Sequence, residues 1–203
     1  MLWPWSSPTS LVALRGPRMV LRLPRPADYD EWYELRHQSR DFLRPFEPRW
    51  TEADLSRRAY ASRVRRAREE AEEGTDFSFF IYRVDGNAET LVGGVTLSNI
   101  RRRAAQFVTL GYWMGQSYAG KGIMTEAVGT CLPFVFDTLM LHRVHAAFLP
   151  GNTASRRVLE KHGFVEEGFA EKYLQINGRW EDHVLFGLTR ERWEAGRYAK
   201  RAV

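Results

Sequence analysis

Cysteine is nearly absent from this sequence of 203 residues, which contains Cys131 and no second cysteine. A single cysteine excludes a disulfide within the chain and a cysteine-rich metal site. No apolar run approaches the roughly 20 residues that a membrane-spanning helix needs. The opening residues MLWPWSSPTSLVALRGPR are too polar and too rich in proline for a signal peptide. We therefore expect a cytoplasmic protein with no membrane segment.

The overall composition is that of a globular protein, with 44% hydrophobic and 27% charged residues. No internal repeat, low-complexity stretch or linker divides the chain. The length suits one domain with a large core. We expect a loosely ordered tail over residues 1–17 and a single domain over residues 18–203.

Arginine dominates the net charge of +5. A basic surface favours polyanionic partners, such as nucleic acid, the ribosome or a multiply phosphorylated cofactor. The alternative is that most arginines lie on solvated helix faces beside glutamates. The run before Gly74 favours this alternative, because Glu69, Glu70, Glu72 and Glu73 follow its arginines.

The pattern of apolar residues and turns predicts seven strands and an α/β fold with a mixed sheet. Hairpin turns at Asp85-Gly86-Asn87 and Asn177-Gly178 flank a central strand-helix-strand arrangement. Strands are expected at Met19–Leu23, Phe77–Val84, Leu91–Ser98, Phe107–Met114, Arg143–Phe148, near Phe164–Leu174 and at His183–Leu188.

Helices are expected between these strands. Thr51 and Asp54 resemble a capping box, and Pro133 should kink the helix that contains it. The expected helices run from Ala27 to about Arg40, from Thr51 to Gly74, from the glycine loop at 120–122 to about Leu139, and over Asn152–His162, with a short one near the C-terminus.

A glycine loop, Ala119-Gly120-Lys121-Gly122-Ile123-Met124, lies between a predicted strand and a predicted helix. Glycines let backbone N–H groups approach an anion, and the start of a helix adds partial positive charge. The loop lacks the third glycine of a dinucleotide-binding motif, and it also lacks the G-x-x-x-x-G-K-S/T pattern of a P-loop. By itself it fits either a pyrophosphate site or a tight turn from strand to helix.

A second segment follows about 30 residues later and reads Asn152-Thr-Ala-Ser155-Arg-Arg-Val-Leu-Glu-Lys161-His-Gly163-Phe164. Together with the glycine loop it resembles motifs A and B of the GNAT acetyltransferase superfamily. In detail the chain is similar to the RimJ/RimL type, the N-terminal acetyltransferases named for ribosomal proteins, and is nearer RimJ. The closer match uses FLRPFEP (42–48), LGYW (110–113), GKGIMTEA (120–127) and NGRWEDHV (177–184), and the resemblance runs from about Met19 to Trp193.

This resemblance implies a GNAT fold and an acetyl-CoA-dependent N-acetyltransferase. The fold would be a central, mixed, mostly antiparallel twisted sheet of about seven strands, flanked by helices and splayed at the acetyl-CoA site. The strand at 112–114 would pair with the pantetheine arm, and the glycine loop would hold the pyrophosphate. The implied cofactor-binding residues are Tyr112, Trp113, Met114, Ala119, Gly120, Lys121, Gly122, Ile123, Met124, Thr125, Asn152 and Ser155.

Some of these assignments have alternatives. Asn152 would hydrogen-bond the pantetheine, but it is also a good N-cap residue. Ala119 stands where the family usually has Gln or Arg, so we expect a looser grip on the phosphates. One residue of Arg156, Arg157 and Lys161 would reach the 3′-phosphate, unless all three lie on a solvated face.

The expected chemistry is direct attack of an amine on the thioester in a ternary complex. An α-amine with a pKa of about 7.7–8.0 is roughly a tenth neutral at pH 7, whereas a lysine near 10.4 is about one part in two thousand neutral. Ser155 is the candidate proton donor to the thiolate. Leu174 replaces the glutamate of RimL-like enzymes, so Glu47 is the candidate base, with a salt-bridge role as its alternative. A water chain would also remove the proton.

The aromatic loop Phe42–Trp50 and the segment Tyr173–Trp180 are expected to wall the acceptor site, unless they pack under the long helices. The candidate substrate-binding residues are Phe46, Glu47, Tyr173 and Trp180. Cys131 lies on an apolar helical stripe and should be buried, which argues against covalent transfer through it. No metal is expected, because the spacing of His142, His145, His162 and His183 is not that of metal ligands.

The leading hypothesis is acetylation of a protein N-terminus, with the ribosome as a partner. A small amine or antibiotic acceptor is the alternative, and it would need a closed pocket in place of an open groove. A non-catalytic acyl-CoA-binding module and an RNA-binding protein are the alternatives outside the enzyme class. The pattern is compatible with a monomer or a homodimer.

Overall fold

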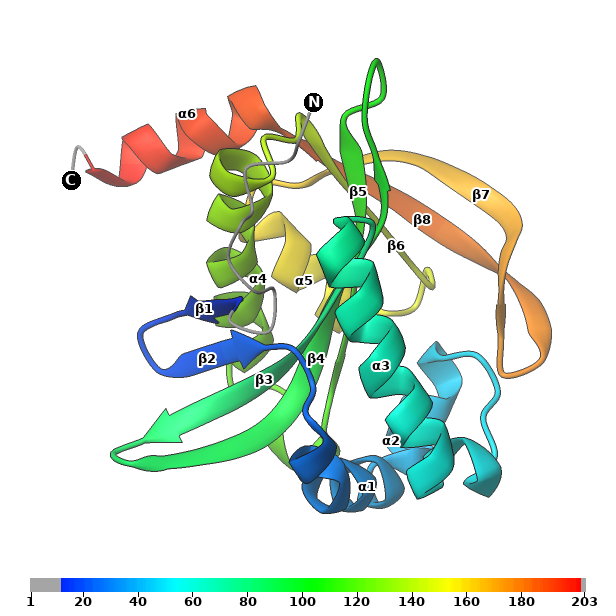
Figure 1. Ribbon diagram of the computed structural model, residues 1–203. Coiled ribbons are helices and arrows are strands. Elements are labelled where there is room, and N and C mark those ends of the chain that lie inside the picture. Colours follow the sequence, from blue (N-terminus) through cyan, green and yellow to red (C-terminus); the bar gives the residue numbers. More distant parts are fainter. Residues whose placement is uncertain (1–11, 202–203) are drawn as a thin grey trace.

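The computed structural model describes residues 12–201, which form one eight-stranded sheet with helices on both faces (Figure 1). The strand order is β1-β2-β3-β4-β5-β6-β8-β7, and the only parallel pair in this described sheet is β5 with β6. The mixed, mostly antiparallel sheet is therefore confirmed. The strands are β1 Ala13–Arg15, β2 Met19–Arg22, β3 Phe77–Asp85, β4 Ala88–Arg101, β5 Phe107–Met114, β6 Arg143–Phe148, β7 Val165–Ile176 and β8 Arg179–Thr189.

The additional strand is β1, which lies inside the tail expected over residues 1–17. Leu14 pairs with Leu21 of β2, and Gly16 donates its N–H to the Met19 carbonyl to close the turn. The tail prediction was wrong for this part, because a three-residue strand is too short to show an alternating pattern. Residues 1–11 of the predicted tail lie outside the described residues.

The helices are α1 Tyr29–Gln38, α2 Arg40–Leu43, α3 Arg57–Glu73, α4 Ile123–Pro133, α5 Thr153–Glu160 and α6 Arg190–Arg201. Thr51 and Asp54 do form a capping box, but it starts a 3-10 turn over Glu52–Leu55. Ser56 then adopts an extended conformation and caps α3 by accepting the Ala59 N–H, at 3.3 Å. The predicted start of this helix at Thr51 was therefore wrong, since two caps follow each other.

Pro133 ends α4, and the chain continues as a π-helical segment over Phe134–Thr138. The Leu139 N–H bonds to the Phe134 carbonyl five residues earlier, at 2.8 Å. The break predicted at Pro133 appears as this change of helical type, because proline lacks the N–H that the α-helical ladder needs.

Apolar side chains pack on both faces of the sheet. The larger core lies between the sheet and α4 and α5, and it includes Cys131, which is fully buried as expected. A smaller, aromatic core joins α1 and α3 to β3 and β4, with Trp32, Tyr60 and Phe80 in contact. No described helix combines the length and apolarity of a membrane span.

The sheet opens at its one parallel pair. The β5–β6 ladder runs from Phe107 and Arg143 to Thr109 and His145, and no further pair joins the two strands. β5 continues to Met114 against β4, and β6 continues to Phe148 against β8. The two strands therefore diverge and leave an opening between them.

Candidate active site

A cavity of ≈ 430 Å³ lies where β5 and β6 diverge. All twelve residues for which the resemblance implied a cofactor contact line it. Two of the four acceptor-site candidates, Phe46 and Glu47, line it as well, whereas Tyr173 and Trp180 do not. The remaining lining residues are Phe42, Leu43, Tyr118, Ala154, Arg157, Val158 and Lys161.

One edge of β5 faces this cavity. From Leu110 to Met114 the strand pairs with β4 on one side and has no strand partner on the other in the described sheet. Such an edge presents unpaired N–H and C=O groups at the spacing of an extended chain. An elongated ligand that carries amide groups can therefore bind here as an added strand.

The glycine loop forms the next part of the wall. Gly120 and Gly122 adopt φ of 74° and 76°, in the left-handed region where glycine is favoured. No side chain caps the N-terminus of α4, so its first N–H groups stay available to an anion. Lys121 adds a positive charge at the rim, where its Nζ donates to the Ser117 carbonyl at 2.7 Å.

Replacing Gly122 with alanine is expected to weaken binding of a diphosphate-containing ligand by about 5–30-fold. A new Cβ would meet no atom within 4 Å, so the cost is the strain of a left-handed alanine, about 1–2 kcal/mol. Equilibrium binding of CoA measures the effect. Gly151→Ala is the matched control, because Gly151 also has open space but does not have a positive φ. Equal losses in both variants would contradict this role of the loop.

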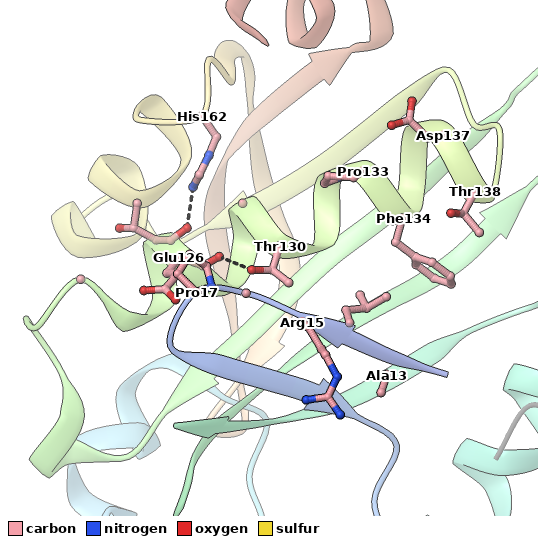
Figure 2. Close-up of a pocket in the computed structure, with 15 residues that line it drawn as sticks. Ala13, Arg15, Pro17, Glu126, Thr130, Pro133, Phe134, Asp137, Thr138 and His162 are labelled. Atoms are coloured by element: carbon pink, nitrogen blue, oxygen red, sulfur yellow. Dashed lines mark hydrogen bonds between the residues drawn. The ribbon is translucent and has the colours of Figure 1, made fainter. Parts of the chain in front are cut away.

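The start of α4 is held from behind by neighbouring elements (Figure 2). His162, which follows α5, lies 2.6 Å from the Thr125 carbonyl through its Nε2. Its ring packs so closely on α4 that a Cβ at Gly129 would lie 2.9 Å from the imidazole Cε1. Arg18, in the β1–β2 turn, binds Glu126 with two nitrogens at 2.7 and 2.9 Å. These contacts position the loop that faces the cavity.

Asn152 and Ser155 are brought together by the start of α5. The Asn152 side chain accepts the Ser155 N–H at 3.0 Å, so the predicted N-cap is confirmed. Ser155 is buried, and its Oγ lies 2.7 Å from the hydroxyl of Tyr112 on β5. Burial raises the pKa of Tyr112 to about 12, although the hydrogen bond to Ser155 opposes this shift. Both hydroxyls therefore stay protonated at neutral pH and can donate.

The positive side chains of α5 divide between two faces. Arg157 and Lys161 line the cavity, together with Lys121 of the glycine loop. Arg156 points elsewhere, because it pairs with Glu166 at 2.9 Å and lies over the Phe186 ring at 5.2 Å. Arg157 and Lys161 are thus the residues placed to meet a phosphate.

Glu47 is the one carboxylate among the described residues that line the cavity. Both of its oxygens accept hydrogen bonds from Arg36, at 2.6 and 2.7 Å, and Trp50 Nε1 donates to one of them at 3.1 Å. The Arg36 guanidinium also stacks near the Trp50 and Trp113 rings, at 4.9 and 4.8 Å. This arrangement holds the loop 44–50 against β5.

The β7–β8 hairpin contributes exposed aromatic residues beside the cavity. Tyr173 and Trp180 are 47% and 59% exposed, and Phe46 on the facing loop is 43% exposed. The two segments touch, because Asn177 in the hairpin turn donates its N–H to the Glu47 carbonyl at 2.8 Å. Of the residues expected to wall the acceptor site, Phe46 thus lies at the cavity, whereas Tyr173 and Trp180 are exposed on the hairpin that contacts its loop.

Several lining residues were not singled out from the sequence. Ala154 and Val158 follow a helical spacing that continues from the start of α5, so this face was recognisable. Tyr118 had no such signal, because it comes from a turn after β5, and neither did Arg36, which lies on α1 and binds Glu47. Among the described residues no cluster of His, Cys, Asp or Glu could hold a metal ion.

Comparisons with known proteins agree with this geometry. A model of the acetyltransferase (GNAT) domain matches residues 18–165. The [ribosomal protein uS5]-alanine N-acetyltransferase of Escherichia coli K12 is 33% identical over 186 residues, which cover 92% of this chain and 95% of that protein.

Two solved structures are also similar. The ribosomal-protein-S5-alanine acetyltransferase of Vibrio fischeri has a TM-score of 0.81 and 34% identity, over 90% of this chain and 98% of that one. Mycobacterium smegmatis RimJ, in complex with CoA-disulfide, has a TM-score of 0.80 and 34% identity, over 89% and 87% of the two chains.

Proposed function

Because this chain belongs to the GNAT acetyltransferase family, as an N-acetyltransferase of the RimJ/RimL type, we propose that it acetylates the N-terminal α-amine of a protein. The observation that supports a polypeptide acceptor is the exposure of Phe46 at the acyl cavity and of Tyr173 and Trp180 on the hairpin that contacts its loop. Exposed aromatic residues gathered at one place are typical of a surface that binds another chain. By analogy with the E. coli relative, we propose a ribosomal protein as acceptor and the cytoplasm as the compartment.

The residues of the cavity fit acetyl-CoA, which supplies an activated acyl thioester. The unpaired edge of β5 suits the amide groups of the pantetheine arm, and the glycine loop suits the pyrophosphate. Lys121, Arg157 and Lys161 offer three cations for the phosphates. Asn152 uses its carbonyl oxygen as a cap, so its amide group is the part assigned to the pantetheine.

In the proposed reaction the amine nitrogen bonds to the acyl carbon and the carbon–sulfur bond breaks. Backbone N–H groups of Tyr112–Met114 donate to the acyl oxygen as it becomes negative. The hydroxyls of Tyr112 and Ser155 form a connected pair, and we assign them the proton that reaches the leaving thiolate. The thiolate thus gains one proton and the amine loses one, so the overall reaction is balanced.

The attacking amine must also give up a proton, which needs an acceptor. Glu47 is our candidate acceptor for it, directly or through water, since it is the carboxylate at the cavity wall. Both of its oxygens already accept hydrogen bonds from Arg36, which fixes the carboxylate at the cavity wall. An α-amine is roughly a tenth neutral at pH 7, so only part of the acceptor has to lose a proton.

Mass spectrometry of protein N-termini, with and without this chain, tests the proposal. We expect a small set of acceptor proteins to lose N-terminal acetylation when the chain is removed. Thiol release with short peptides, compared with polyamines and aminoglycosides, tests the same point with purified enzyme. Turnover of small amines alone would overturn the proposed acceptor, and CoA binding without any turnover would overturn the proposed reaction.

Replacing Glu47 with glutamine is expected to lower kcat/KM for the amine by about 10²-fold, as loss of a general base does. Glu52→Gln is the matched control. Glu52 also pairs with an arginine, Arg40, in the same loop, but the side chains of that pair are 55% and 43% exposed and lie outside the cavity. The kcat/KM profile against pH measures the effect. Unchanged kcat/KM with only a lower Tm would assign Glu47 a structural role.

A further inference from the structure

Helix α3 carries a row of arginines, and most of them are paired. Arg65, Arg66 and Arg68 lie within 3.9, 3.7 and 2.9 Å of the glutamates four residues later. Arg57 pairs with Asp30 of α1 at 2.6 Å. These contacts agree with the expectation that the arginines and glutamates of this helix form a solvated face.

Arg63 differs from this row in both position and partners. It lies three residues after Tyr60 and four before Ala67, which are both buried, so it projects from the side of α3 that faces the sheet. Among the described residues it has no hydrogen bond and no ion pair. Its guanidinium carbon lies over the Trp32 ring, 5.4 Å from the ring centroid.

A recess of ≈ 300 Å³ lies in front of Arg63, between α3 and strands β3 to β5. Phe80 and Thr96 form part of its floor, and Trp113 lines both this recess and the acyl cavity. The indole lies across the neighbouring strand, since a Cβ at Gly94 would be 2.5 Å from its Nε1. Trp113 thus forms a wall that the recess and the acyl cavity share.

The recess has a cation, Arg63, near one end and two carboxylates near the other. Near Trp113, Arg36 is neutralised by Glu47, whereas Arg63 has no ion pair with any residue that the structure describes. Burial lowers the pKa of Arg63, and the nearby Arg36 and Arg66 lower it further, while Glu47 and Asp54 oppose them. The carboxylates Glu70 and Asp76 line the far end. Glu70 lies about 10 Å along the helix axis from Arg63.

An arginine held in this way favours an anion. Its side chain is exposed beside the recess, and no carboxylate among the described residues forms an ion pair with it. A carboxylate that approached it would gain charge-assisted hydrogen bonds from the planar guanidinium. At the far end Glu70 already pairs with Arg66 and Asp76 adds a second carboxylate, so an anion is favoured at Arg63.

We propose that Arg63 binds the carboxylate side chain of an acidic residue near the N-terminus of the acceptor polypeptide, and so determines which acceptors are acetylated. This proposal rests on the proposed function. The link to the reaction is Trp113, whose strand faces the acyl cavity. Because Trp113 lines both cavities, we place the acidic residue within the first few positions after the amine, each of which advances an extended chain by about 3.3 Å.

Paired peptides test the proposal with the full-length enzyme. Each peptide begins with alanine and carries one glutamate at its second, third or fourth residue, and its partner has glutamine there. We expect wild-type enzyme to favour one glutamate peptide over its partner by about tenfold or more, in kcat/KM for thiol release and in peptide affinity measured with CoA present. Arg63→Gln should abolish this preference and leave the glutamine peptides unaffected.

Arg58→Gln is the control, because Arg58 is exposed on the same helix, as Arg63 is, but lies outside the recess. It should retain the full preference. The Tm of Arg63→Gln should be unchanged or higher, because no ion pair is lost. Equal use of both peptides of every pair by the wild-type enzyme would overturn the proposal, as would an equal effect of Arg58→Gln.

The outcomes also separate this proposal from the proposed function. Turnover of peptides without any preference would retain the function and overturn the role of Arg63. An Arg63-dependent preference in binding, with no turnover of any peptide, would overturn the function and retain the recognition site. Arg63-dependent binding of an RNA oligonucleotide, with no discrimination among peptides, would overturn the assignment to a peptide carboxylate.

Discussion

Replacing Ser155 with alanine is expected to lower kcat by about 10–150-fold with little change in CoA affinity. Ser155 Oγ lies 2.7 Å from the Tyr112 hydroxyl, and we expect this pair to stabilise the leaving thiolate. A hydrogen bond to a charged group contributes about 1.5–3 kcal/mol, and each 1.36 kcal/mol is tenfold in rate. The Asn152 cap survives in this variant, because it uses the backbone N–H of residue 155.

Tyr112→Phe should have a similar effect, and the double variant should lose less than the product of the two single losses. The two hydroxyls act as one connected donor, so removing either interrupts it. Thr153→Ala is the control on the same helix, at an exposed position outside the cavity. Single-turnover rates at saturating acetyl-CoA measure the effect. Full activity of both single variants would contradict this assignment.

The same pair predicts the shape of the pH profile. The pKa of Tyr112 is raised to about 12, so this donor stays protonated through neutral and moderately alkaline pH. The rate with a peptide should therefore rise as the α-amine loses its proton, near pH 8, and reach a plateau. A fall in rate between pH 8 and 10, in an enzyme that remains folded, would contradict a donor whose pKa is raised in this way.

Replacing Asp28 with asparagine is expected to lower the free energy of unfolding by about 3–5 kcal/mol, the usual cost of breaking a buried ion pair. The Asp28 oxygens accept two hydrogen bonds from Arg22, both at 2.8 Å, and one from the Arg25 N–H at 2.7 Å. The side chains of Asp28 and Arg22 are only 8% and 11% exposed. The variant would leave the Arg22 charge buried without its counter-charge.

This loss should depend on pH. Burial raises the pKa of Asp28, but the hydrogen bonds from Arg22 and Arg25 outweigh burial, so the folded pKa lies below its ordinary value of about 3.9. The contribution of Asp28 to the free energy of unfolding is therefore complete above that value, and it is lost as the pH falls through the folded pKa. Urea unfolding at pH 7 and at acidic pH should show the difference between wild type and Asp28→Asn shrinking at low pH.

Asp30→Asn is the control for this prediction. Asp30 also pairs with an arginine, Arg57, but the two side chains are 78% and 70% exposed. Exposed pairs contribute less than about 1 kcal/mol, because water screens both charges. Equal destabilisation by the two substitutions would contradict the buried role of Asp28.

Local patterns in the sequence predicted the features that depend on neighbouring residues. The hairpin turn at Asn177-Gly178 and the cap at Asn152 each rest on backbone bonds within a few positions, and both are confirmed. The Arg65–Glu69 and Arg68–Glu72 pairs follow from helical spacing alone. The start of α3 was misplaced, since Thr51 and Ser56 carry similar capping signals and only one of them begins the helix.

The acyl side of the active site was therefore recognisable from the sequence, because the glycine loop and the start of α5 are continuous motifs. The tertiary structure decided the contacts that join distant segments. The Tyr112 and Ser155 hydroxyls are 43 residues apart in the chain, and Arg36 meets Glu47 only because α1 packs against the loop before α3. Spacing cannot reveal such contacts, since they depend on how separate elements pack. The same packing places Arg63, which has no ion pair among the described residues, beside a recess, and so distinguishes it from Arg58 on the same helix.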